Sequence, residues 1–197
     1  MSFVVAVANE HIAYLAADRM LVSKSGRHES LDTCKIIPCS HQCAVGIAGD
    51  FFIARQTIQL CRQQGVFDNP PQILKRLKDT ALAADLLYRV RQQYRPDYAL
   101  IIANHYASTP SLAVVTLAEG EARIFQEPLR AGEFQFLFSN PADIPFDTCR
   151  TLCYQSLLAT TESQLQASLV QLVSDVAKRS AVVNTHVDLW CSQPLSK

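Results

Sequence analysis

Several features are scarce in this 197-residue sequence, and their scarcity excludes whole classes of protein. Neither positive nor negative charge is in excess, because 18 basic side chains balance 18 acidic ones. Proteins that bind nucleic acid usually carry a surplus of Lys and Arg, so we expect no nucleic-acid partner. No apolar run reaches the roughly 18–20 uncharged residues that a membrane-spanning helix needs, so we expect no membrane partner either.

The N-terminal region also lacks the marks of a secretory signal. Its apolar run has no basic segment before it and is interrupted by Glu10 and His11. We therefore expect a cytoplasmic protein whose thiols stay reduced.

The seven cysteines are not spaced like metal ligands. Cys34, Cys39 and Cys43 contain no C-x-x-C pair, while Cys149 and Cys153 stand four residues apart, on one face of a predicted helix. Such positions suit small buried apolar groups. The five histidines show no ligand spacing and there is no nucleotide-binding glycine pattern, so we expect no metal and no cofactor.

The predicted elements follow the order strands, two helices, strands, two helices and a last strand. Apolar runs bounded by turn residues predict the strands, and apolar side chains at helical spacing predict the helices. The strands are expected at 3–8, 12–17, 34–38, 43–49, 98–103, 112–116, 122–125, 134–138 and 182–190, and the helices at 51–64, 69–90, 146–158 and 165–176. This order favours stacked sheets covered by helices, in one domain over residues 1–197.

The first predicted hairpin brings together residues that can do chemistry. Its strands, 3–8 and 12–17, are joined by the short polar segment Asn9-Glu10-His11. In an antiparallel pair the start of the first strand lies beside the end of the second, so we expect Asp18 near Ser2. A carboxylate buried beside a hydroxyl and an amino terminus indicates a reactive site.

The second strand pair, 34–38 and 43–49, adds a cation and a glycine. Lys35 is a charged residue at the start of an otherwise apolar strand, and Gly49 ends the next strand just before Asp50, a candidate helix N-cap. Simpler explanations exist for each residue alone. Lys35 and Asp18 could be a buried ion pair that fixes strand register, Gly49 a turn, and Ser2 an ordinary terminal residue.

Taken together, these residues resemble those of the proteasome β-type N-terminal nucleophile hydrolases, including the HslV peptidase and other bacterial proteasome homologues. The similarity covers nearly the whole chain in element order. Its specific motifs are Ser2 opening a hairpin, Asp18-Arg19 ending it, Lys35 opening the third strand and Ala48-Gly49-Asp50 ending the fourth. The resemblance implies an α+β fold: a four-layer αββα sandwich of two stacked, mostly antiparallel sheets flanked by helix pairs.

The resemblance also implies roles for these positions. It assigns the terminal nucleophile to Ser2, a structural aspartate to Asp18, a catalytic lysine to Lys35 and an oxyanion-hole glycine to Gly49. The family nucleophile in proteasomes is usually Thr, whereas this chain has Ser.

Two later positions match less closely. The family's Gly-Ser-Gly-like segment appears here as Phe138-Ser139-Asn140-Pro141, so Ser139 takes the place of the family serine. Near the last strand, Ser180 is well placed for the serine that supports the terminal amine. The nearest acid, Asp175, lies too far upstream for the aspartate that accompanies it.

A serine at the very terminus would carry its own base once Met1 is removed. A serine hydroxyl needs a base to take its proton, and an α-amino group titrates near about 7.7–8.0. Lys35 would lower the pKa of that amine through charge repulsion, and Asp18 would keep the lysine oriented. The N–H of Gly49 would face the developing oxyanion.

The sequence therefore predicts a threonine-peptidase-type hydrolase with a serine nucleophile, which cleaves peptide amide bonds. The resemblance implies a ring-forming homo-oligomer that acts on peptides or unfolded proteins, with an ATPase as a candidate partner. Two alternatives remain open. One is a catalytically silent scaffold of the same fold, and the other is an amidase that acts on a small non-peptide amide.

Overall fold

The computed structural model describes residues 2–22, 28–30, 32–106, 109–126, 129, 132, 134–157 and 160–192. Its strands are β1 (Val4–Ala8), β2 (Ala13–Asp18), β3 (Leu21–Val22), β4 (His28–Ser30), β5 (Ile36–Ser40), β6 (Cys43–Gly49), β7 (Tyr98–Asn104), β8 (Ser111–Ala118), β9 (Glu121–Gln126), β10 (Gln135–Ser139) and β11 (Val187–Cys191). Its α-helices are α1 (Phe51–Gln63), α2 (Ile73–Gln92), α3 (Phe146–Leu157) and α4 (Leu165–Ala177).

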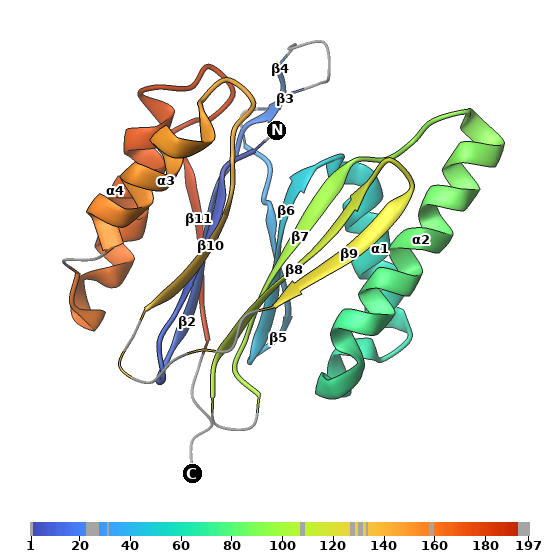
Figure 1. Ribbon diagram of the computed structural model, residues 1–197, viewed down its shortest axis with the longest axis horizontal. Coiled ribbons are helices and arrows are strands. Elements are labelled where there is room, and N and C mark those ends of the chain that lie inside the picture. Colours follow the sequence, from blue (N-terminus) through green and yellow to red (C-terminus); the bar gives the residue numbers. More distant parts are fainter. Residues whose placement is uncertain are drawn as a thin grey trace.

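Two antiparallel sheets form the centre of the molecule. One has four strands in the order β10-β1-β2-β11, and the other has five in the order β5-β6-β7-β8-β9. The sheets face each other, with α3 and α4 outside the first and α1 and α2 outside the second (Figure 1). The predicted four-layer αββα sandwich is therefore confirmed.

Three apolar clusters fill the spaces between these four layers. The middle cluster joins the two sheets and consists mostly of small or branched side chains, among them Val4, Ala6, Leu15, Ala44 and Ile101. Each outer cluster packs one sheet against its helix pair. Small residues bring the sheets close together, because a Cβ added at Gly46 would lie only 2.6 Å from Val4 Cγ1.

The two edges of the sandwich differ. At one edge β5 packs against β11, so the sheets meet there. At the other edge β10 packs against β7 and β8, while β9 ends its own sheet. Along β9, every residue except Ala122 is exposed, which leaves that edge open to solvent.

The N-terminal hairpin forms as predicted, with the start of β1 beside the end of β2. Val4 pairs with Ala17 and Ala8 with Ala13, and both strands are buried throughout. β1 also pairs with β10, so the first strand lies inside its sheet. After the hairpin, the short strands β3 and β4 pair with each other, and residues 23–27 between them lie outside the described part of the chain.

The predicted N-cap at Asp50 and the predicted helix start at residue 69 both need correction. Asp50 stands at the N-cap position of α1, but its side chain makes no capping hydrogen bond. Instead its carboxylate accepts hydrogen bonds from the Tyr94 hydroxyl at 2.8 Å and from the Asp97 N–H at 2.7 Å. Asn69 also makes no side-chain cap, and the residues after it form a 3₁₀ turn, Pro70–Gln72, before α2 begins.

No helix within the described ranges is both long and apolar enough to cross a membrane.

Candidate active site

Asp18 lies at the end of β2 and accepts three hydrogen bonds. Its Oδ1 accepts from the N–H of Phe3 at 3.0 Å. Its Oδ2 accepts from the N–H of Met20 at 2.9 Å and from Lys35 Nζ at 2.8 Å. The side chain is fully excluded from solvent. Asp18 therefore joins the backbone just before β1 to the ammonium of Lys35.

Lys35 lies directly before β5 and is fixed on three sides. Its ammonium contacts Asp18, its carbonyl accepts from the N–H of Ile47 at 3.0 Å, and its own N–H donates to Asp188 Oδ2 at 2.7 Å. The side chain is 0% exposed, so the ammonium has lost its hydration shell. A lysine in such a place is costly to bury and is tolerated only with a fixed partner.

Burial shifts the pKa of both members of this pair toward the neutral forms. Desolvation raises the pKa of Asp18, against the opposing attraction of Lys35. Desolvation likewise lowers the pKa of Lys35, against the attraction of Asp18 and of Asp188. The ammonium of Lys35 consequently gives up its proton more readily than an exposed lysine does.

Ser2 lies between Asp18 and Ser139. The peptide N–H that follows Ser2 donates to Asp18, while the carbonyl of Ser2 accepts a hydrogen bond from Ser139 Oγ at 2.8 Å. Ser139 Oγ in turn accepts from the N–H of Val4 at 2.8 Å. Ser2 is buried. The structure thus brings Ser2, Asp18, Lys35 and Ser139 together, whereas Met1 lies outside the described residues.

Gly49 ends β6 with a backbone that only glycine adopts readily. Its φ is +96°, and an added Cβ would lie 2.4 Å from the carbonyl oxygen of Asp97. The N–H of Asp50 donates to that same Asp97 oxygen, which makes Gly49 and Tyr98 a non-hydrogen-bonded pair. In such a pair the amides point away from the partner strand, so the Gly49 N–H faces the side of β6 on which Lys35 lies.

Ser180 has a carboxylate partner that the sequence analysis missed. Its Oγ donates to Asp143 Oδ1 at 2.8 Å, and the N–H of Ala181 donates to Asp143 Oδ2 at 2.7 Å. Asp175, the acid considered from the sequence, is partly exposed and pairs with Lys178 instead. Asp143 lies in the segment between β10 and α3, four residues after Ser139. Spacing around Ser180 gave no signal for an acid 37 residues upstream.

Asp188 on β11 is a second residue that sequence reasoning did not place in the site. Besides binding the N–H of Lys35, it lies 3.4 Å from Arg19 Nε. Its side chain is 11% exposed. No pattern in the sequence marks Asp188 as part of the site, because its pairing with β2 opposite Ala17 joins segments far apart in the chain.

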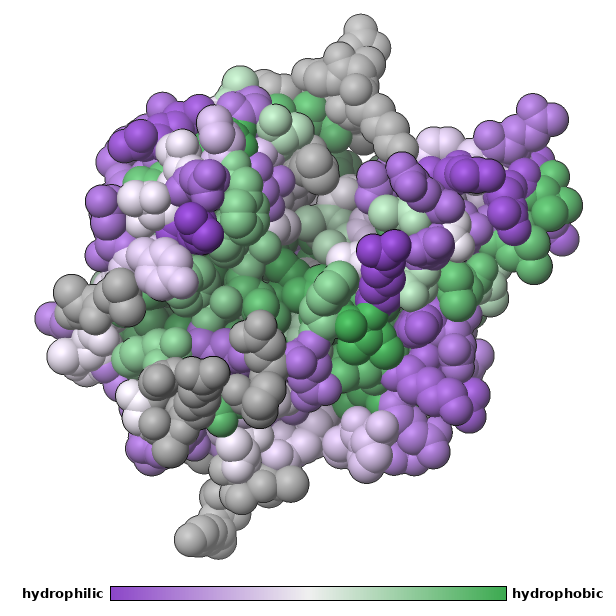
Figure 2. All heavy atoms as spheres, viewed as in Figure 1, coloured by the Kyte–Doolittle hydropathy of each residue, from purple (hydrophilic) through white to green (hydrophobic). Residues whose placement is uncertain are grey.

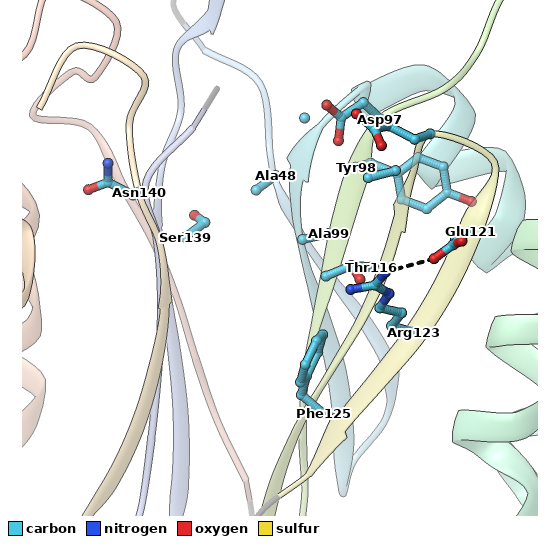
Figure 3. Close-up of a pocket in the computed structure, with 13 residues that line it drawn as sticks. Ala48, Asp97, Tyr98, Ala99, Thr116, Glu121, Arg123, Phe125, Ser139 and Asn140 are labelled. Carbon is cyan, nitrogen blue, oxygen red and sulfur yellow. Dashed lines mark hydrogen bonds and ion pairs between the residues drawn. The ribbon is translucent and has the colours of Figure 1, made fainter. Parts of the chain in front are cut away.

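A cleft opens beside Gly49 and Ser139, between the two sheets at the β9–β10 edge. It has a volume of about 620 Å³. Figure 3 shows Ser139 and Asn140 on one wall and Ala48, Ala99, Thr116 and Arg123 on the other. Figure 2, in the view of Figure 1, shows a hollow with an apolar floor between the two halves of the molecule. Of the candidate site residues, Gly49 and Ser139 line this cleft.

Groups of three or more His, Cys, Asp or Glu side chains that could hold a metal are absent from the described ranges. The seven cysteines are all free thiols, and Cys149 and Cys153 are buried.

The two facing sheets and their outer helix pairs give the chain a four-layer αββα fold that is known from solved structures. Among solved structures, the chain is similar to eukaryotic HslV from Trypanosoma brucei, with a TM-score of 0.64. The match covers 96% of this chain and 98% of that one at 15% sequence identity. The predicted resemblance to HslV is thus confirmed for the fold. No family model matches the chain, and no match was found among curated proteins.

Proposed function

We propose that this chain is an N-terminal nucleophile hydrolase that cleaves peptide amide bonds, with Ser2 as nucleophile after removal of Met1. The observation that carries the proposal is the hydrogen bond from the N–H of Phe3 to Asp18, whose other oxygen binds Lys35. It places a buried ion pair one peptide bond from Ser2.

In the proposed reaction the α-amine of Ser2 takes the hydroxyl proton, directly or through a water. Ser2 Oγ then attacks the carbonyl carbon of the scissile amide, and the carbonyl π electrons move to oxygen. The nearby Lys35 ammonium lowers the pKa of the α-amine by repulsion and stabilises the hydroxyl oxygen as its proton leaves. Asp18 holds that ammonium in place.

Collapse of the tetrahedral intermediate expels the leaving amine, which takes the proton from the α-ammonium and leaves an ester on Ser2. Water then attacks this ester by the same route, releases the acid and returns the proton to Ser2 Oγ. The Gly49 N–H faces the β6 side where the oxyanion would form, and one such donor is worth about 2.7–4 kcal/mol.

Two further residues support this geometry. Ser139 orients Ser2 through its carbonyl, at 2.8 Å. Ser180, fixed by Asp143, fits the family's supporting serine, with an acid from a different segment. We assign both to positioning of the nucleophile.

The proposal extends to assembly. We propose that residues 1–197 form one catalytic unit of a ring-forming homo-oligomer in the cytoplasm, which acts on peptides or unfolded proteins without a cofactor and pairs with an ATPase. The HslV-like fold supports this, as do the exposed apolar side chains on the outer helices, including Phe52 and Val90. Native mass spectrometry would give the number of subunits.

Intact mass combined with a peptide-cleavage assay tests the proposal. We expect a mass that lacks Met1 and hydrolysis of fluorogenic peptides, both in the same preparation. Ser2→Ala should abolish hydrolysis while its thermal unfolding stays unchanged. Cleavage of small amides alone would instead favour the amidase, and a processed, folded protein without any hydrolysis would favour the silent scaffold.

A further inference from the structure

The cleft between the sheets is hollow because its floor is made of small side chains. Strand register places Ala48 opposite Ala99, Ala99 opposite Thr116, and Thr116 opposite Arg123. The four therefore form one row across the inner face of the sheet. The side chains of Ala48, Ala99 and Thr116 are too short to reach the facing sheet. The cleft that they leave has a volume of about 620 Å³, which is within the usual range of ligand sites.

One side of the floor is closed by a larger apolar group. Phe125 stands two residues after Arg123 on β9, on the same face, and its ring lines the cleft (Figure 3). It is 54% exposed, which is unusual for a phenylalanine that packs in a core. The ring therefore offers free apolar surface to a group that enters from the open edge.

The rim of the cleft carries an excess of negative charge. Its charged side chains are Asp97, Glu119, Glu121 and Arg123. Arg123 is already neutralised, because its Nη2 lies 2.7 Å from Glu121 Oε2 (Figure 3). Asp97 has no ion-pair partner in the described part of the chain, and Glu119 has only a longer-range attraction to Arg123. Two carboxylates are thus available to an incoming cation.

From this shape and charge we propose that the cleft is a substrate subsite for a Lys or Arg side chain next to the scissile bond. An aliphatic stem would cover Ala48, Ala99 and Phe125, and the charged end would reach Asp97 and Glu119. Gly49 and Ser139 also line the cleft, which makes it continuous with the candidate active site. The inference rests on the proposed function, since it names the substrate class of that same site.

Paired fluorogenic peptides that differ only in Lys, Leu or Glu at one position test the subsite. The position is scanned on both sides of the scissile bond. We expect kcat/KM for the Lys peptide to exceed that for the Glu peptide by about tenfold or more at one position. This ratio should shrink as salt is raised, because exposed charges are screened within about 8–10 Å.

Variants of the rim test the role of its charges, and a variant outside the cleft is the control. The double variant Asp97→Asn with Glu119→Gln should lower kcat/KM for the Lys peptide about fivefold or more and leave the Leu peptide unchanged. Arg123→Gln frees Glu121 and should raise the preference for Lys. Asp147→Asn removes an 83%-exposed carboxylate on α3 and should change kcat/KM for neither the Lys peptide nor the Leu peptide. Equal effects on the Lys and Leu peptides, or no effect of the double variant, would overturn the subsite.

A binding measurement separates this inference from the proposed function. Fluorescence anisotropy of labelled Lys, Leu and Glu peptides with the Ser2→Ala protein needs no hydrolysis. Preferential binding of the Lys peptide, lost in the rim double variant, supports the subsite even when the wild-type protein cleaves nothing. Cleavage with neither a Lys preference nor Lys-selective binding supports the proposed function and overturns the subsite.

Discussion

Lys35 Nζ lies 2.8 Å from Asp18 Oδ2, and both side chains are fully excluded from solvent. Each group loses its hydration on folding, and the attraction between them offsets only part of that cost. The pair is therefore weak evidence for stability, but it makes each member dependent on the other. Removing one leaves the other as an uncompensated buried group.

Lys35→Met should destabilise the fold strongly. The substitution keeps most of the side-chain volume but leaves Asp18 buried without its cation, which costs about 3–5 kcal/mol in comparable pairs. Urea denaturation at pH 7 measures the loss. Adding Asp18→Asn to Lys35→Met removes the stranded charge, so the double variant should be more stable than Lys35→Met alone. A double variant as unstable as the sum of the two single ones would contradict this coupling.

The stability of Lys35→Met should also depend on pH in a defined direction. Burial already raises the pKa of Asp18 above its ordinary 3.8, and Lys35 opposes that rise. Without Lys35 the pKa rises further, so above pH 3.8 the folded variant keeps a proton that the unfolded chain has released. The free energy of unfolding, relative to wild type, should therefore fall as pH increases through this window. Urea titrations between pH 4 and pH 8 would show it.

Gly49→Ala should destabilise more than a substitution at another glycine with positive φ. At Gly49 the new Cβ meets the Asp97 carbonyl oxygen at 2.4 Å, in addition to a φ of +96°. Gly132, with a φ of +76° and nothing within 4 Å of its Cβ position, is the matched control. Backbone strain costs each variant about 1–3 kcal/mol, and the clash adds to that at Gly49. Thermal unfolding of the two variants gives the comparison, and equal shifts would contradict the close approach.

Local patterns in the sequence predicted the order of the elements and the hairpin around the candidate site, and the family resemblance supplied the four-layer fold. The hairpin of β1 and β2 follows from two apolar runs with a polar turn, and antiparallel pairing then places Asp18 beside Ser2. Lys35 and Gly49 were noticeable because a charge and a glycine interrupt apolar runs. These signals lie within the first fifty residues and needed no knowledge of long-range contacts.

Asp143 and Asp188 could not be found in this way. Asp188 reaches Lys35 across 153 residues and Asp143 reaches Ser180 across 37, and no local pattern distinguishes either carboxylate from a surface acid. The cleft could not be predicted for the same reason. Ala48, Ala99, Thr116 and Arg123 are ordinary in sequence, and only the register of four strands puts them in one row.

Asp143 and Ser180 should act as one unit. Ser180→Ala removes the donor to Asp143 Oδ1 and should cost about 1–2 kcal/mol, and Asp143→Ala, which also frees the N–H of Ala181, should cost more. The double variant should be less destabilised than the sum of the single ones. If the unit positions the nucleophile, kcat should fall in both single variants, and KM should change little. Asp175→Ala, at the partly exposed acid on α4, is the control and should leave kcat unchanged.

Asp188→Asn should lower the pKa of Lys35. Burial lowers that pKa, while the negative charges of Asp18 and Asp188 raise it, so loss of the Asp188 charge moves it further down. Asparagine keeps an oxygen for the Lys35 N–H, which preserves the backbone contact at 2.7 Å. Titration of the Lys35 Nζ resonance by NMR measures the shift directly. In kcat/KM profiles the alkaline limb should move to lower pH, because the proposed reaction needs the ammonium form.

Asp32→Asn is the matched control for this charge. Asp32 contacts the same Arg19 Nε at 3.0 Å but is 68% exposed and does not contact Lys35. Its substitution changes the net charge by the same amount as Asp188→Asn and should leave the Lys35 titration in place, because an exposed charge is screened by water. Equal shifts in the two variants would mean that Lys35 responds to net charge alone. A shift confined to Asp188→Asn would identify Asp188 as the residue that positions Lys35 and tunes its proton.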